Sequence, residues 1–154
     1  MNRFLVDYRA LSVARKRPMS SVFMRAPDLE KDGWCLHDGE QLNRDAPQTF
    51  LIPDLALRRS LQPGDYAKLV FEIAVEGDEY PIIERMWVIV RERIPSGYVG
   101  MLDNEPDSIS ENDSFWLGTE IPFDHRHIIA VRRGNDASLA LAKAPVPIPW
   151  DRTN

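Results

Sequence analysis

The fold of this chain is decided by residues 66–102, which read YAKLVFEIAVEGDEYPIIERMWVIVRERIPSGYVGML. Residues 66–73 and 82–93 each place apolar side chains at alternate positions and are enriched in β-branched and aromatic residues. This pattern is typical of strands with one buried face. Turn formers separate these two runs, and Pro95 to Gly97 separate the second from a third run at residues 98–102. The stretch predicts a three-strand antiparallel meander, enough strands to fold on one apolar face.

Further short elements are expected on both sides of the meander. After it, residues 118–123 and 128–131 are strand candidates. Before it, residues 54–61 predict a short helix that the Asp54 side chain caps. Residues 27–48 contain Asp and Gly turn signals around a tryptophan and predict irregular loop structure. We therefore expect an α+β, mainly β fold, either a twisted antiparallel meander sheet or a small, partly open barrel, with one or two short helices.

The length of 154 residues favours one domain. In this interpretation residues 1–62 form an N-terminal segment that packs on a sheet core at residues 63–133. Within that segment, residues 4–13 fit a strand or a short helix equally well, and residues 21–24 predict a short strand. Prolines alternate through residues 144–150 of the tail at 144–154, which excludes a helix and favours an extended path ending at a packed Trp150.

Composition excludes several classes of protein. The one cysteine, Cys35, cannot form an internal disulfide, and it suits a reducing compartment. We find no export signal and no run of about 18 apolar residues, so we expect a cytoplasmic protein that does not enter a membrane. The net charge of −5 argues against binding to nucleic acid. No motif of a cofactor-binding or hydrolytic enzyme is present, and we expect neither a cofactor nor a metal.

Charge is distributed unevenly along the chain. Basic residues dominate before Pro27, whereas the stretch from Asp103 to His125 carries seven carboxylates and no Lys or Arg. An acidic surface of this kind would complement a basic partner, because opposite charge speeds encounter and helps to select the partner.

Three groups of residues invite a chemical role, and each has an ordinary structural alternative. Asp103 and Glu105 could divide acid and base roles, but Asp is also a common turn residue. His125 and His127 would share a face in an extended strand and could approach one metal, although no third ligand is evident. Cys35 has no basic partner nearby in the sequence and fits a small buried side chain.

Three blocks of the meander and its exit resemble the bacterial family catalogued as domain of unknown function 2314. They are Pro63 to Leu69, Glu84 to Val88 and Leu102 to Pro106, and residues 118–123 resemble the closing segment of that family. Upstream, Asp32 to Trp34 and Asp38 to Glu40 resemble an immunity-protein family of bacterial polymorphic toxin systems. Together these resemblances imply a small protein that neutralises a secreted toxin by binding it, and they imply no catalytic residue.

We therefore expect an immunity protein that occludes the active site or substrate surface of a cognate toxin, for example a basic nuclease. The alternatives are a housekeeping module that binds a small ligand or a protein, and a small hydrolase. The expected contact residues lie in the loops at residues 27–48 and 103–113, together with one tryptophan that follows. They are Asp32, Trp34, Asp38, Glu40, Asp103, Glu105, Asp107, Glu111, Asp113 and Trp116.

Overall fold

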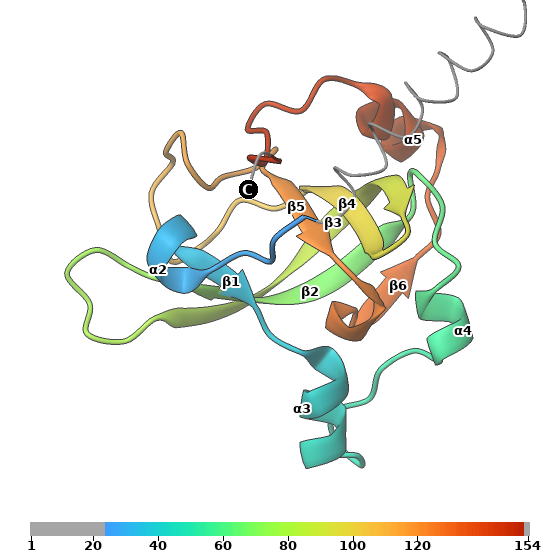
Figure 1. Cartoon of the computed structure of the whole chain (residues 1–154), viewed down its shortest axis with the longest axis horizontal. Coiled ribbons are helices and arrows are strands. Elements are labelled where there is room, and N and C mark those ends of the chain that lie inside the picture. The colour runs from blue at the N-terminus through green and yellow to red at the C-terminus, as the bar shows by residue number, and fades with distance from the viewer. Residues whose placement is uncertain (1–23, 153–154) are drawn as a thin grey trace, which may run out of the picture.

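A computed structural model describes residues 24–152 of the chain (Figure 1). Residues 4–13 and all but the last residue of the strand expected at 21–24 lie outside this range. Among the described residues, no helix has the length and apolar character needed to cross a membrane.

The predicted meander is confirmed and forms the centre of a six-stranded antiparallel sheet. The strand order is β1-β2-β3-β4-β5, and β6 shares the outer edge of β2 with β1, because β1 pairs with residues 71–73 and β6 with residues 66–68. Figure 1 shows the sheet curled into an open half-barrel. The strands are β1 (Trp34–Leu36), β2 (Tyr66–Ile73), β3 (Ile82–Ile94), β4 (Gly97–Leu102), β5 (Glu120–Phe123) and β6 (Ala130–Arg132).

The inner face of the sheet carries the main core. The alternation of β2 turns Leu69 and Phe71 inward, and the same alternation of β3 turns Met86 and Val88 inward. Aromatic side chains from outside the meander complete this core: the rings of Trp34 and Phe115 lie 4.9 Å apart, and those of Trp34 and Trp150 lie 5.8 Å apart. The α+β, mainly β fold class is therefore confirmed.

The expectation of loop structure at residues 27–48 is wrong. This segment contains α2 (Leu29–Asp32), β1 and α3 (Gly39–Asp45). Its aspartates act as helix caps: the Asp28 carboxylate accepts hydrogen bonds from two amides of α2, and the Asp38 carboxylate accepts one from the Gln41 amide. The Asp and Gly residues of this segment thus mark the ends of short helices, and not only turns.

The helix expected at residues 54–61 exists as α4 (Leu55–Arg58), but Asp54 does not cap it with its side chain. The Arg58 side chain holds this helix instead. It is 5% exposed and donates to the Pro53 carbonyl, the Glu40 carboxylate and the His125 carbonyl. One buried guanidinium thus joins α4 to α3 and to the 3-10 helix η1 (His125–His127).

Helix α5 (Asp136–Lys143) was not predicted and covers part of the outer face of the sheet, where Ala142 packs with Ile89 and Met101. The tail that follows is non-helical and returns to the core, as expected, with Trp150 buried. A buried carboxylate on β5 holds it there: Glu120 accepts from the Trp150 amide and from the guanidinium groups of Arg91 and Arg152.

Candidate functional site

Two acidic loops meet at one end of the sheet. The β2–β3 loop, residues 74–81, and the β4–β5 loop, residues 103–119, lie on the same side of the molecule near α2 (Figure 1). Between them runs a groove of about 500 Å³, lined by residues 32–33, 73–76, 108–112 and 114–115. No Lys or Arg lines this groove. We call these two loops and the groove the acidic end.

Exposed carboxylates without a partner define the chemistry of the acidic end. Seven of them lie in the two loops, and within residues 24–152 none has a hydrogen bond or ion pair through its side chain. They are Glu76, Asp78, Glu79, Glu105, Asp107, Glu111 and Asp113. Several other carboxylates of the fold are paired, for example Glu40 with Arg58 and Glu120 with Arg91. Like charges so close together repel one another, so this end of the molecule favours a cationic partner.

The β4–β5 loop is held in a defined shape despite its charge. The Glu84 carboxylate on β3 accepts hydrogen bonds from the Asp107 and Ser108 amides and from the Ser108 hydroxyl. Further along, the Asn112 side chain accepts from the Ser114 and Phe115 amides, and Phe115 is buried in the core. The unpaired carboxylates are therefore presented by a braced loop.

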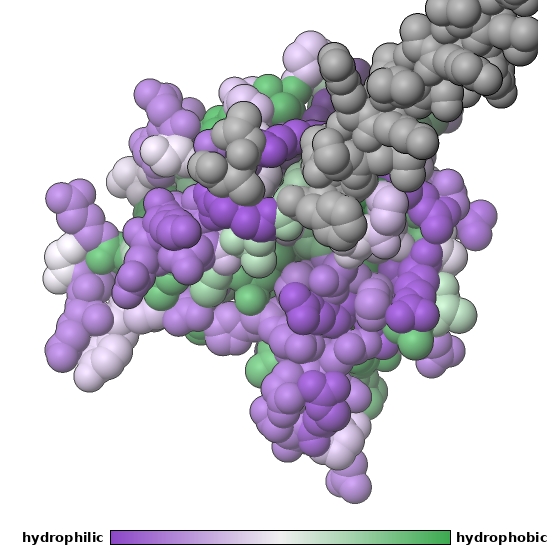
Figure 2. Space-filling view, in the orientation of Figure 1, coloured by the Kyte–Doolittle hydropathy of each residue, from purple (hydrophilic) through white to green (hydrophobic). Residues whose placement is uncertain are grey.

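An aromatic side chain lies within this acidic surface. Tyr80, in the β2–β3 loop, is 74% exposed, and nearby Ile83 is also exposed. Tyrosine is enriched among the residues that dominate binding at protein interfaces. In Figure 2 the residues over the β2–β3 loop, at the left edge, are mostly hydrophilic, and the rim of a protein interface is typically polar.

The structure brings together about half of the contact residues expected from the sequence. Glu105, Asp107, Glu111 and Asp113 are exposed on the β4–β5 loop. Asp32 lines the groove, but its carboxylate binds the Arg25 guanidinium at 2.7 and 2.8 Å, and this hydrogen bonding holds the pKa of Asp32 below its usual value. Its charge is thus already balanced.

The remaining expected contact residues lie elsewhere or are not available. Trp34 is 2% exposed and belongs to the core, so its side chain offers no contact surface. Asp38 caps α3 and Glu40 pairs with Arg58, both away from the acidic end (Figure 1). Trp116 belongs to the β4–β5 loop, but it is half-buried in the turn before β5, where its amide donates to the Thr119 hydroxyl.

Sequence reasoning missed the contribution of the β2–β3 loop. The turn formers between the first two strands, Gly77 and Asp78 among them, predict only a turn from the sequence, and no binding role is expected there for the carboxylates beside them or for Tyr80. The signal was present in the sequence, since residues 76–80 read EGDEY and contain no Lys or Arg. What it lacked was a reason to place this hairpin beside the β4–β5 loop.

The two histidines considered as metal ligands do not lie in a strand. They lie in η1, where residues two apart point in different directions, so the argument that both could face one metal is wrong. His127 is buried, and its Nδ1 accepts a hydrogen bond from the Asp124 amide. Burial lowers the pKa of His127, so the buried ring favours the neutral form. No group of three metal-ligating side chains occurs within residues 24–152.

Cys35 is half-buried on β1 and has a partner that its local sequence did not reveal. Its Sγ lies 3.4 Å from Glu72 Oε2, and the same oxygen lies 3.1 Å from His37 Nε2. Burial, followed by the Glu72 contact, raises the pKa of the Cys35 thiol to about 11. A nucleophilic cysteine needs a lowered pKa, so this arrangement favours a structural thiol.

Asp103 and Glu105 do not form an evident acid and base pair. Asp103 is half-buried at the end of β4, where its amide donates to the Trp87 carbonyl, and burial raises its pKa. Glu105 is exposed on the loop beyond it. Different environments can separate two carboxylates chemically, but neither of these two lines the groove of the acidic end.

Comparison with protein-family models, with curated proteins and with solved structures finds no match to the chain. The family resemblance inferred from the sequence therefore stays a prediction, and the functional argument depends on the geometry of the acidic end.

Proposed function

We propose that this protein binds a partner protein with a basic surface through the acidic end, and that this binding neutralises the partner, as in the immunity proteins that the sequence resembles. The observation that carries the proposal is the set of seven exposed, unpaired carboxylates on two adjoining loops. A fold gains nothing in stability from such a concentration of like charge, so a role in recognition accounts for it best.

The physical form of the acidic end suits occlusion of a cationic cleft. The β4–β5 loop is braced by Glu84, so little conformational entropy is lost when it docks. Charge accelerates encounter, and the exposed Tyr80 ring on the β2–β3 loop would supply an aromatic contact. A nuclease with a basic substrate cleft is one partner with the required complementarity.

The proposal is tested by capture of a partner from lysate of the source organism, followed by co-expression of this protein with the captured partner in a host that the partner kills. We expect one basic partner whose lethality is relieved in proportion to complex formation. Relief without a stable complex, or a stable complex with no effect on toxicity, would contradict neutralisation by binding.

A pair of matched variants tests the surface. Glu76→Gln/Glu111→Gln removes two unpaired charges from the groove, and Asp54→Asn/Asp136→Asn removes two exposed charges elsewhere. We expect the first variant to slow association by roughly tenfold at low salt, with the difference shrinking as salt screens the charges, and the second to change it little. Equal effects of the two variants would show that only net charge matters and that the acidic end is not the contact surface.

A further inference from the structure

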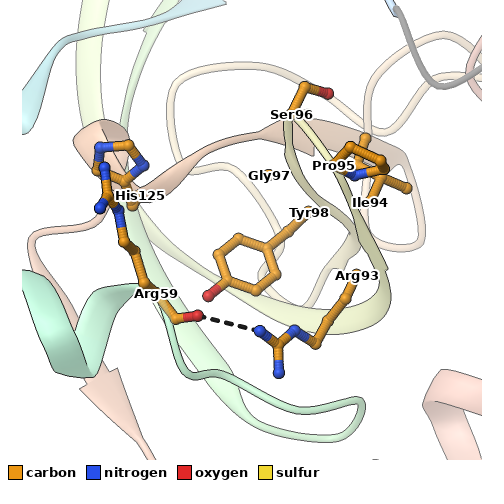
Figure 3. Close-up of a pocket in the computed structure, with 8 residues that line it drawn as sticks. All are labelled: Arg59, Arg93, Ile94, Pro95, Ser96, Gly97, Tyr98 and His125. Carbon is orange, nitrogen blue, oxygen red and sulfur yellow. Dashed lines mark hydrogen bonds between the residues drawn. The ribbon is translucent and has the colours of Figure 1, made fainter.

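A second pocket, of opposite charge, lies at the other end of β3. Its volume is about 370 Å³, and its walls come from the end of α4, the β3–β4 turn and η1 (Figure 3). The acidic groove adjoins the strand pair Ile73 and Ile82, whereas this pocket is lined by Arg93 and Ile94, so the two are separated by most of the length of a 13-residue strand. We call it the arginine pocket.

Two arginines in this pocket have no acidic partner. Arg59 and Arg93 are both exposed, and among the described residues no carboxylate lies within ion-pair distance of either. Within residues 24–152 the one hydrogen bond of the Arg93 side chain goes to the Arg59 carbonyl, at 3.2 Å, which leaves most of its donors free there. His125 lines the same pocket. In a chain with a net charge of −5, two unpaired guanidinium groups that share a concave surface form a local positive site.

The pocket is built on rigid supports. Figure 3 shows the Tyr98 ring between Arg59 and His125 on one side and Arg93 on the other. The Tyr98 hydroxyl donates to the Arg58 carbonyl at 2.7 Å and accepts from the Leu61 amide, so it fixes the segment that carries Arg59 to β4. Buried Arg58 in turn holds the His125 carbonyl at 2.9 Å.

The β3–β4 turn is fixed equally firmly. Gly97 has φ +148°, and a Cβ there would lie 2.5 Å from the Phe123 carbonyl oxygen and 2.6 Å from the Asp124 Cβ. Only glycine allows the turn to approach the Asp124–His125 segment this closely. The backbone segments that carry the two arginines are therefore fixed on opposite sides of the pocket.

From these observations we infer that the arginine pocket binds the phosphate group of a small molecule. Guanidinium groups match phosphate oxygens with pairs of parallel hydrogen bonds. Figure 3 shows the Arg59 guanidinium beside His125 and the Arg93 guanidinium on the other side of Tyr98, so one phosphate contacts both only when these exposed side chains turn toward each other. The pocket volume lies near the lower end of the range for small-molecule sites, and the Ile94 and Pro95 side chains offer an apolar wall for the rest of a phosphomonoester. This inference does not depend on the proposed function of the acidic end.

The inference is tested by isothermal titration calorimetry of the full chain with three probes: adenosine 5′-monophosphate, adenosine and inorganic phosphate. We expect the monophosphate to bind at least tenfold more tightly than adenosine, a difference of about 1.4 kcal/mol. Inorganic phosphate should compete with it. Equal affinity of monophosphate and phosphate would identify free phosphate as the ligand, and tighter binding of the monophosphate would identify a phosphomonoester.

Variants of equal charge change locate the site. Arg59→Gln and Arg93→Gln should each weaken binding of the monophosphate by roughly tenfold, while Arg133→Gln, at an exposed arginine that lines a different pocket, should weaken it less than about threefold. Circular dichroism checks that each variant is folded. The inference is overturned if neither phosphate probe binds at about 1 mM, if adenosine binds as tightly as its monophosphate, or if Arg133→Gln has the same effect as Arg59→Gln.

Discussion

Replacing Glu120 with glutamine removes a buried negative charge that holds the tail on the sheet. Glu120 is 3% exposed and accepts from Arg91 at 3.1 Å, from Arg152 at 2.8 Å and from the Trp150 amide at 3.0 Å. Glutamine keeps the shape and can still accept from the Trp150 amide. Its amide group, however, would meet a guanidinium donor, and both arginines would lose their buried counter-ion.

The expected loss of stability depends on which hydrogen-bond partners each arginine keeps when Glu120 is replaced. Removing one partner of a buried ion pair typically costs about 3–5 kcal/mol. Here Arg91 still donates to the Ala142 and Ala144 carbonyls, and Arg152 still reaches Glu92 at 3.1 Å. We therefore expect the free energy of unfolding to fall by about 2–3 kcal/mol and the melting temperature to fall by roughly 6–8 °C.

Equilibrium unfolding in urea, followed by tryptophan fluorescence, measures this loss through the midpoint of the transition. The matched control is Glu92→Gln, which removes a carboxylate that also pairs with Arg152 but is exposed to solvent. Exposed pairs contribute little, so we expect the control to lose less than about 1 kcal/mol. If Glu120→Gln were no less stable than the control, the buried carboxylate would not be what holds the tail.

Three further predictions concern single residues. The pKa of Cys35 near 11 means that iodoacetamide should alkylate this thiol slowly at about pH 8, and Glu72→Gln should speed the reaction; alkylation of the native chain as fast as a small free thiol would contradict the assigned environment. Because burial lowers the pKa of His127 in the folded state, the unfolded chain binds the proton first as pH falls, so stability should be complete above about pH 6.5 and decline below it. Urea unfolding across this pH range checks the decline, and His127→Gln should reduce it; an unchanged slope in that variant would assign the effect to other groups. Gly97→Ala should lower the melting temperature far more than Gly77→Ala. Both residues have positive φ, but of the two only Gly97 has backbone within contact distance of the added Cβ. Thermal denaturation of the two variants provides the comparison.

Local patterns in the sequence determined the meander, because a two-residue alternation needs no distant information to be recognised. The three strands at residues 66–102 lie where the alternation and turn residues placed them, and the extended tail follows from its prolines. The acidity of residues 103–113 and their exposure were also local properties. By contrast, the short helices at residues 29–32 and 39–45 were missed, because the same aspartates and glycines that form turns also cap helices.

The tertiary structure alone decided which charges are free and which are balanced. In the sequence, Glu40, Glu120 and Glu76 are equivalent carboxylates. In the structure Glu40 binds an arginine 18 residues away and Glu120 binds one 29 residues away. Glu76 instead faces solvent, beside the loop that follows the last strand of the meander. The same holds for Arg59 and Arg93, which share a pocket only because the β3–β4 turn approaches η1. Pairing depends on distances of a few ångströms between residues far apart in the chain. Such distances are set by how the sheet curls and where its loops return, which no local pattern of residues records.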